Sequence, residues 1–407
     1  MPDILEAPAE TEPEMTQERI CRICGQGELE TFFDAAEIPV QLNVLWSKRA
    51  EALECTKGHI RLAFCRKCGC IRNVTFEPEL LRYDVSYENS LHFSPVFQEY
   101  AQALAIDLVG RYDLHGKVVV EIGCGKGEFL AMLCELGNNA GVGFDPAYAD
   151  GRGSAAAGKG IKFVTQMFPG AGADAACDFV CCRHVLEHVG DPRELLLSIR
   201  RSAGRERGPV VYFEVPNAMF TLQGAGMWDV IYPHCSYFSR PSLRSLFTSC
   251  GFEVLTLREG FAGQYLSIEA VPRQARAEMV SDNGAQLDAV QQAVTDFAEK
   301  YRKKTEELGR ALDLLRSSRK RAVLWGAGAK GMMFLNKFRN LAAIDYVVDV
   351  NPHKHGKFVS GSGQEIVAPE FLKEYRPDVI FLANLNYREE IGRQVRDLGL
   401  EPTFTSI

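Results

Sequence analysis

Four cysteines near the start of the chain are arranged as two Cys-x-x-Cys pairs, each followed by glycine. They are Cys21, Cys24, Cys65 and Cys68. Two such turns can present four thiolates to one tetrahedral Zn²⁺, whereas a redox-active pair normally occurs singly at the start of a helix. Four protein ligands leave no open position on the ion, so we expect a structural zinc that folds a short module.

A glycine-rich turn follows the apolar residues 118–120, which we expect to form the first strand of a nucleoside-binding sheet. The acid and the glycines of this turn are Glu121, Gly123, Gly125 and Gly127. A dinucleotide fingerprint would need a glycine where Glu128 stands. Glycines let the backbone pass close to a cofactor, and Asp145, at the end of the next expected strand, could accept hydrogen bonds from both hydroxyls of a ribose.

This turn resembles the cofactor loop of class I S-adenosylmethionine (SAM) methyltransferases, and the segment 183–192 resembles the same class. Strand and helix patterns alternate after Asp145, as a doubly wound parallel sheet requires. Ligands of such sheets bind outside the C-terminal ends of the strands. We therefore expect Met167 and Phe168 to lie beside the adenine, and Arg183 to contact the cofactor.

A histidine surrounded by ring side chains and hydroxyl groups follows the next expected strand, which ends at Asn217. This residue, His234, is well placed to take a proton from a substrate held beside the methyl group, and its ordinary pKa near 6.5 suits that task. Tyr232 and His188 are expected to be catalytic groups beside it. The alternative is a histidine that is hydrogen-bonded in the core of a loop.

The cysteine pairs, the SAM domain and a second nucleotide-type fold, in this order, resemble the bacterial sugar C-methyltransferases. The resemblance runs from Cys21 to Ile407, and the motif His-x-x-Tyr-Phe-Ser at 234–239 carries much of it. It implies that His234 removes the proton next to the ketone of a nucleotide-linked deoxysugar, and that the resulting enolate attacks the SAM methyl group. Family members often have a glutamate where this chain has Pro233, and Asn-Asp-Gly where it has Gly-Lys-Gly at 125–127.

A second glycine turn, at 326–331, has the G-x-G-x-x-G spacing. On spacing alone it would bind a dinucleotide, whereas the resemblance implies that this domain holds the nucleotide of the substrate; a purely structural domain is the third alternative. The segment 81–95, rich in rings and hydroxyls, is either a packed connector or a lid over the substrate. The residues expected to bind the substrate are Tyr83, Tyr87, Asn217, Gly326, Gly328, Lys330, Asn351, Lys354 and Asn384.

The chain divides into consecutive parts of different composition. These are a disordered tail at 1–18, a zinc-binding module at 19–75, a class I methyltransferase α/β domain at 76–274, a long connecting helix at 275–320 and a smaller Rossmann-like α/β domain at 321–407. Apolar residues recur at three- and four-residue steps along the connecting helix. This seam lies either across the two domains or against a second subunit, so a monomer and a homodimer are both compatible with it.

The composition of the chain limits which binding partners and which cellular compartment we expect. A net charge of −7 and a pI near 5.7 give no basic footprint for nucleic acid. We find neither a run of about eighteen apolar residues nor a signal peptide, so we expect a cytoplasmic protein without membrane attachment, whose thirteen cysteines stay reduced. The expected activity is SAM-dependent C-methylation of a nucleotide-linked sugar. The alternatives are O- or N-methylation of a non-sugar metabolite, and a non-catalytic SAM-binding scaffold.

Overall fold

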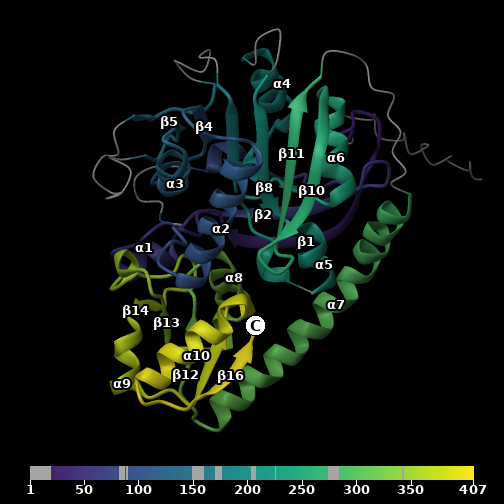
Figure 1. Cartoon of the computed structure of the whole chain (residues 1–407). Coiled ribbons are helices and arrows are strands. Elements are labelled where there is room, and N and C mark those ends of the chain that lie inside the picture. Colours follow the sequence, from purple (N-terminus) through teal and green to yellow (C-terminus); the bar gives the residue numbers. More distant parts are fainter. Residues whose placement is uncertain are drawn as a thin grey trace, which may run out of the picture.

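Three sheets organise the chain (Figure 1). The computed structural model describes residues 20–81, 88, 90–148, 160–169, 177–202, 208–224, 226–273, 284–341 and 343–407. The tail expected at 1–18 lies outside these residues, as do Tyr83 and Tyr87.

The N-terminal sheet has the strand order β1-β2-β3-β9, and its neighbours are antiparallel. Its elements are β1 (Leu29–Pro39), α1 (Arg49–Leu53), β2 (Lys57–Cys65), β3 (Ile71–Asn73), the 3₁₀ turn η2 (Pro78–Leu80) and β9 (Ser236–Tyr237). Strand β9 comes from the methyltransferase region and pairs Tyr237 with Ile71. The sheet of the N-terminal module is therefore completed by a strand from far along the chain.

The central sheet has seven strands in the order β10-β11-β8-β7-β4-β5-β6. They are β4 (Val118–Ile122), β5 (Ala140–Phe144), β6 (Ile161–Val164), β7 (Phe179–Arg183), β8 (Val210–Pro216), β10 (Phe252–Gly260) and β11 (Tyr265–Pro272). Strand β11 is antiparallel to both of its neighbours, and the other pairs are parallel. Every residue of β7 is buried, because helices cover both faces of the sheet. The doubly wound α/β fold predicted from the sequence is confirmed.

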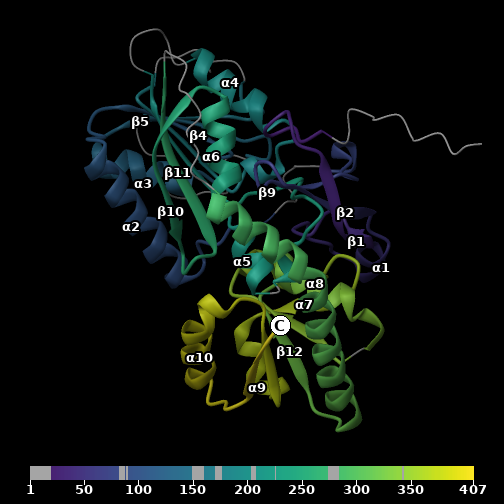
Figure 2. The same cartoon turned by 90° about the vertical axis from the view of Figure 1, so that its right-hand side faces the viewer.

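Helices α2 (Pro95–Arg111) and α3 (Glu128–Gly137) share one hydrophobic core with this sheet, and α4 (Pro192–Ser202) and α6 (Arg240–Ser249) share another. Figure 2 shows the two pairs on opposite faces. The short elements η3 (Leu186–His188), α5 (Ala218–Gln223) and η4 (Met227–Asp229) follow the ends of β7 and β8. The chain reverses its direction across the sheet between β4 and β7, so the ligand site is expected beyond the ends of these two strands.

The C-terminal sheet is fully parallel, in the order β14-β13-β12-β15-β16. Its strands are β12 (Ala322–Trp325), β13 (Tyr346–Val348), β14 (Glu365–Val367), β15 (Val379–Leu382) and β16 (Thr403–Ser406). Its helices are α8 (Ala329–Lys337), α9 (Leu372–Tyr375) and α10 (Arg388–Asp397), with 3₁₀ turns at Arg339–Leu341, Pro352–Lys354, Pro369–Phe371 and Leu385–Tyr387. The predicted smaller Rossmann-like domain is present.

A single helix of 34 residues, α7 (Gly284–Ser317), runs along both α/β domains (Figure 2). Its N-terminal half packs Phe297 against Phe32 and Phe33 of β1, with ring centroids 6.1 and 5.6 Å apart. Its C-terminal half buries Leu308 and Leu312 in the same core as the C-terminal sheet. The predicted apolar seam is thus buried across the parts of one chain.

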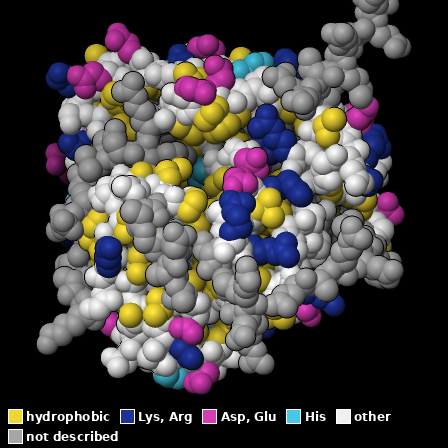
Figure 3. All heavy atoms as spheres, turned by 90° about the horizontal axis from the view of Figure 1, so that it is seen from above, with side chains coloured by type: hydrophobic (Ala, Val, Ile, Leu, Met, Phe, Trp, Pro, Cys, Tyr) yellow, Lys and Arg dark blue, Asp and Glu magenta, His cyan; other side chains and the backbone are white. Residues whose placement is uncertain are grey.

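The face of the molecule seen from above carries basic and acidic side chains interspersed with hydrophobic ones (Figure 3). This mixture agrees with the small negative net charge of the chain. Among the described helices, none combines the length and the apolar character that crossing a bilayer requires.

Replacing Phe297 by alanine should lower the free energy of unfolding by about 3–5 kcal/mol, because a fully buried ring is removed from the junction of α7 and β1. Urea denaturation measures the loss. Leu314→Ala on the same helix is the control: this side chain is 68% exposed, so its loss should change stability by less than about 0.5 kcal/mol. Equal effects of the two variants would contradict the packing of α7 described above.

Candidate active site and metal centre

The four predicted cysteine ligands converge in the N-terminal module. The Sγ atoms of Cys21 and Cys68 are 3.7 Å apart, as are those of Cys24 and Cys65, and all four lie within 4.8 Å of one another. Ligands about 2.3 Å from a tetrahedral Zn²⁺ would be separated by about 3.8 Å. The cluster therefore has the dimensions of a closed four-thiolate metal site.

Local backbone geometry shapes this cluster. The N–H of Gly25 donates to the carbonyl of Cys21, and the N–H of Gly69 donates to that of Cys65, at 2.8 and 2.9 Å. Both glycines have positive φ angles, 67° and 74°, which residues other than glycine rarely adopt. Each glycine after a Cys-x-x-Cys pair thus closes the turn that aims its thiols inward.

The first glycine turn leaves β4 in a left-handed backbone conformation. Gly123, Gly125 and Gly127 have φ of 69°, 55° and 79°. A Cβ on Gly123 would stand 2.1 Å from a methyl carbon of Val185, so the turn lies directly against the segment after β7. A Cβ on Gly125 would have open space around it, as a loop that cradles a cofactor requires.

Two acids flank this turn. Asp145, directly after β5, accepts the N–H of Gly125 on Oδ2 (2.9 Å) and that of Ala147 on Oδ1 (2.8 Å). Each carboxylate oxygen has a further lone pair, so both ribose hydroxyls of a nucleoside could still bind there. Glu121 is buried in β4, burial raises the pKa of its carboxyl to about 8, and Oε2 has no hydrogen-bond partner. A buried orphan oxygen under the loop fits a site that a cationic cofactor completes.

The residues expected beside the adenine lie beyond the end of β6. Met167 is 66% exposed, and the ring of Phe168 packs edge-on against Phe144, with centroids 5.3 Å apart. An exposed apolar side chain next to an anchored ring, beyond the strand ends, offers a surface on which an adenine could pack.

Arg183, predicted as a cofactor contact, instead forms a buried ion pair at the end of β7. Its Nε and Nη2 donate to Oε1 of Glu214 in β8, at 3.0 and 2.9 Å, and its guanidinium lies over the ring of Phe129. The hydroxyls of Tyr100 and Tyr212 donate to the other oxygen of Glu214. Burial alone would raise the pKa of Glu214, but Arg183 and the neighbouring donors hold it well below its usual range.

His188 lies three residues after Val185, the residue that faces Gly123, and its ring lies beside that of His234, the predicted base. Its Nδ1–H donates to the carbonyl of Pro233 (2.9 Å), and its ring centroid lies 4.9 Å from that of His234. Burial lowers the pKa of His188 to about 4 and that of His234 well below its ordinary value. Nδ1 of His234 is buried without a hydrogen-bond partner. At neutral pH His234 is therefore uncharged and has a ring nitrogen that can accept a proton.

Tyr232, predicted as a catalytic group, is a core residue. It is fully buried, its ring packs on Gly58 and Phe76, and its hydroxyl accepts the backbone N–H of Glu77 (3.0 Å). The chain turns between Tyr232 and His234, so the side chains of these two residues point in different directions. The structure does not bring this hydroxyl to the histidine pair.

The two lysines predicted to bind the substrate have partners inside the protein. Lys354, 6% exposed, donates to the carbonyl of Ala327 (3.0 Å) and lies 3.3 Å from the carboxylate of Asp349. Lys330 pairs with Asp229 at 3.0 Å and lies over the ring of Phe220. A diphosphate would have to displace these partners.

The second glycine turn itself lies where the C-terminal sheet reverses direction, between β12 and β15. Gly326 has φ of 111°, and a Cβ there would stand 3.0 Å from that of Ala383. Gly328 precedes α8, and a Cβ on it would meet nothing within 4 Å. Of the three glycines of this turn, Gly328 is thus the one beside which an added Cβ would meet no protein atom.

Two of the three predicted asparagines connect the domains. Asn351 donates to Oε1 of Glu88 (3.1 Å), and Glu88 forms an ion pair with Lys126 of the first glycine turn (2.8 Å). Asn384 donates to Gln264 of the methyltransferase domain at 2.9 Å. Asn217 caps α5 and donates to the carbonyl of Gly263, so both ends of its amide serve the fold.

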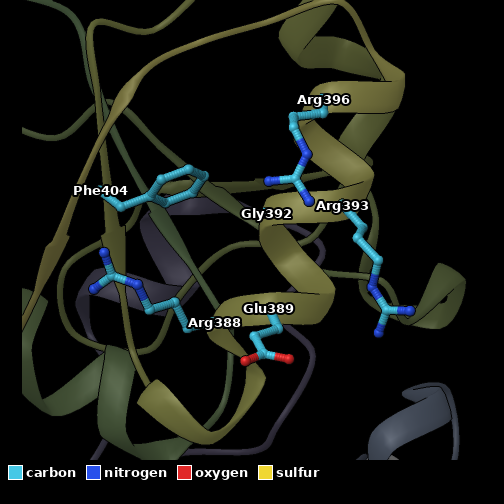
Figure 4. A pocket seen from close by; sticks show the side chains of 6 residues that line it. All are labelled: Arg388, Glu389, Gly392, Arg393, Arg396 and Phe404. Carbon is cyan, nitrogen blue, oxygen red and sulfur yellow. The ribbon is translucent and has the colours of Figure 1, made fainter.

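A separate hollow of about 610 Å³ lies between α10 and β16 (Figure 4). Its lining residues are Arg388, Glu389, Gly392, Arg393, Arg396 and Phe404. Arg388 and Arg396 extend on the side of the Phe404 ring, whereas Arg393 points away from it (Figure 4). No residue predicted to bind cofactor or substrate lines this hollow.

Sequence reasoning missed the buried acids that organise the site. The sequence predicts no role for Glu214, Glu88 or Glu187. A glutamate within an apolar strand, as in 210–216, is the signal that could have identified Glu214, since buried charges need partners. No comparable pattern marks the other two.

Comparison with known proteins adds two family matches. Residues 97–257 match the family described as "Methyltransferase domain", and residues 268–401 match "C-methyltransferase C-terminal domain". These matches identify a SAM-dependent methyltransferase. The C-methyltransferase NovU of Streptomyces niveus is 27% identical over 397 residues, which cover 91% of this chain and 90% of that protein.

Solved structures of methyltransferases are similar to part of the chain. The magnesium protoporphyrin IX methyltransferase of Synechocystis PCC 6803, solved with bound SAH, is 19% identical with a TM-score of 0.35, covering 44% of this chain and 84% of that one. The 1,6-didemethyltoxoflavin-N1-methyltransferase of Burkholderia thailandensis is 16% identical with a TM-score of 0.33, covering 44% and 82%.

Gly123→Ala should weaken SAM binding at least about tenfold, because a Cβ there combines positive-φ strain of about 1–2 kcal/mol with a clash against Val185. Isothermal titration calorimetry with SAM measures the change. Gly116→Ala is the matched control, since Gly116 has φ of 64° and open space around it. The control should lose stability but keep its SAM affinity; a Gly123→Ala enzyme with unchanged affinity would remove this turn from the cofactor site.

Proposed function

We propose that this methyltransferase transfers a methyl group to the carbon next to the ketone of a nucleotide-linked deoxysugar, with His234 as the base. The observation that carries the proposal is the uncharged, buried imidazole of His234 beside the segment that follows β7, at the point where the central sheet reverses direction. The match of the C-terminal region to a C-methyltransferase domain supports a carbon acceptor. The relative named as a C-methyltransferase supports it further.

The proposed reaction has two steps. His234 takes the proton alpha to the ketone, so the C–H electron pair becomes the enolate. The enolate carbon then attacks the methyl carbon of SAM in line, the S–CH₃ bond breaks, and neutral S-adenosylhomocysteine leaves. SAM supplies the methyl cation equivalent when bound. The residues proposed to hold it are Glu121, Asp145 and the glycines of the first turn, with Met167 and Phe168 at the adenine.

The substrate is proposed to span the two α/β domains. Gly326 and Gly328 would approach its nucleotide at the open turn before α8, where backbone N–H groups suit a phosphate. Asn351 and Asn384 lie on the surfaces through which the domains meet. Lys330 and Lys354 would take part by exchanging their internal partners for phosphate.

His234→Asn should keep the SAM affinity of the wild type and lose about 100- to 10,000-fold of the methyl-transfer rate, the usual contribution of a general base. The assay uses thymidine diphosphate 4-keto-6-deoxyglucose as the probe and follows both methylation and solvent-deuterium exchange at the carbon next to the ketone.

Wild-type rates in the His234→Asn enzyme would remove this residue from the mechanism. Wild-type enzyme that methylates a hydroxyl or amine acceptor, without exchanging an alpha hydrogen of the keto sugar, would instead favour O- or N-methylation.

We also propose that the four-thiolate site holds one structural Zn²⁺. The spacing of the four sulfur atoms supports this proposal. The ligand type supports it too, because thiolates bind Zn²⁺ in preference to harder cations. The ion would join the turn before β1 to the end of β2 and stabilise a small sheet.

Cys68→Ser should reduce the zinc content from one equivalent per chain and lower the melting temperature, because one of four ligands is lost. Elemental analysis and calorimetry measure the two effects. Cys55→Ser is the control, since Cys55 is also buried but lies outside the cluster. Zinc retained in Cys68→Ser and lost in Cys55→Ser would disprove the ligand set.

A further inference from the structure

A buried carboxyl group stands beside the proposed base, and one of its oxygens has no hydrogen-bond partner. Glu187 is 2% exposed and belongs to the 3₁₀ turn η3 that follows β7. Polar atoms of Glu187, His188 and His234 lie within 4.8 Å of one another. Oε2 of Glu187 and Nδ1 of His234 have no hydrogen-bond partner. An acid and a base, both buried and unsatisfied, thus share one small space.

Proton abstraction would create a charge in this space. His234 is 9% exposed and becomes an imidazolium when it takes the substrate proton. A buried cation is costly unless an anion lies nearby, and an opposite charge within about 4–6 Å favours the charged form by one to three pKa units. Burial holds the pKa of Glu187 at about 8 in the absence of such a cation. The acid therefore lacks a positive partner until His234 is protonated.

Neighbouring acids are already used. Glu214 is bound by Arg183 and two tyrosines, and Asp229 pairs with Lys330. The residue directly before the histidine is Pro233, whose carbonyl accepts the His188 hydrogen bond and whose ring carries no charge. Of these acids in the described part of the chain, Glu187 is the one left available for His234.

We infer that Glu187 is a positioning residue that stabilises the protonated form of His234 during enolate formation. The inference rests on the proposed function. In the step that Glu187 assists, its carboxyl group has already lost its proton to solvent. The substrate C–H bond then breaks, its electron pair enters the enolate, and the proton forms an N–H bond on His234 while the ionised Glu187 carries the opposing negative charge. Methyl transfer then consumes the enolate, and the proton leaves His234 for solvent before the next cycle.

Two substitutions separate charge from packing. Glu187→Gln keeps the size of the side chain and loses the charge, whereas Glu187→Asp keeps the charge on a shorter side chain. Deuterium exchange into thymidine diphosphate 4-keto-6-deoxyglucose, measured with and without S-adenosylhomocysteine, should slow about tenfold to a thousandfold in Glu187→Gln. Glu187→Asp should stay faster than Glu187→Gln. Both variants should keep the SAM affinity of the wild type.

A purely structural role of Glu187 predicts the opposite order of exchange rates, since glutamine fills the site and aspartate leaves a gap. That order, or equal exchange rates in Glu187→Gln and wild type, would overturn the inference about Glu187 and leave the proposed function standing. Loss of one metal equivalent per chain in Glu187→Gln, by elemental analysis, would also overturn it, because the cluster would then bind a cation through His234. Absence of exchange in the wild type would remove the proposed function and, with it, this inference.

Discussion

The methyltransferase site depends on keeping one carboxylate charged where water does not reach it. Glu214 is completely buried, so its charge is tolerated only because Arg183, Tyr100 and Tyr212 direct donors at it. These donors come from α2, β7 and β8. Nε2 of His184 lies 3.1 Å from Oε1 of Glu214, and the backbone of His184 is left-handed, with φ of 56°. The single charge thus fixes the ends of two adjacent strands, and with them the start of the segment that reaches His188.

A second buried acid relates the two α/β domains. Glu88 contacts Lys126 in the first glycine turn and Asn351 beyond β13, so one carboxylate bridges loops that are more than two hundred residues apart. The ammonium group of Lys126 and the amide of Asn351 therefore share one buried acid, which ties the first glycine turn to the C-terminal domain.

The sequence was most informative where geometry is local. Positive φ at Gly123 and Gly125 and the inward turn of each Cys-x-x-Cys pair follow from residue type and short spacing. It was least informative where a side chain had to choose a distant partner. Arg183, Lys330 and Lys354 have the chemistry of ligand contacts, but Glu214, Asp229 and Asp349 satisfy them first. Whether a charge faces a ligand or another side chain is decided by tertiary packing, which spacing does not encode.

The strand shared by the N-terminal module and the methyltransferase domain limits how this enzyme can evolve. Strand β9 begins two residues after His234 and is the outer neighbour of β3. Transplanting the cysteine module alone into another enzyme would leave β3 without this neighbour, and deleting it would leave the histidine segment unsupported. Recombination can therefore exchange the module only together with the segment around His234. The two regions, separated by more than 160 residues in the gene product, are expected to be inherited as one unit.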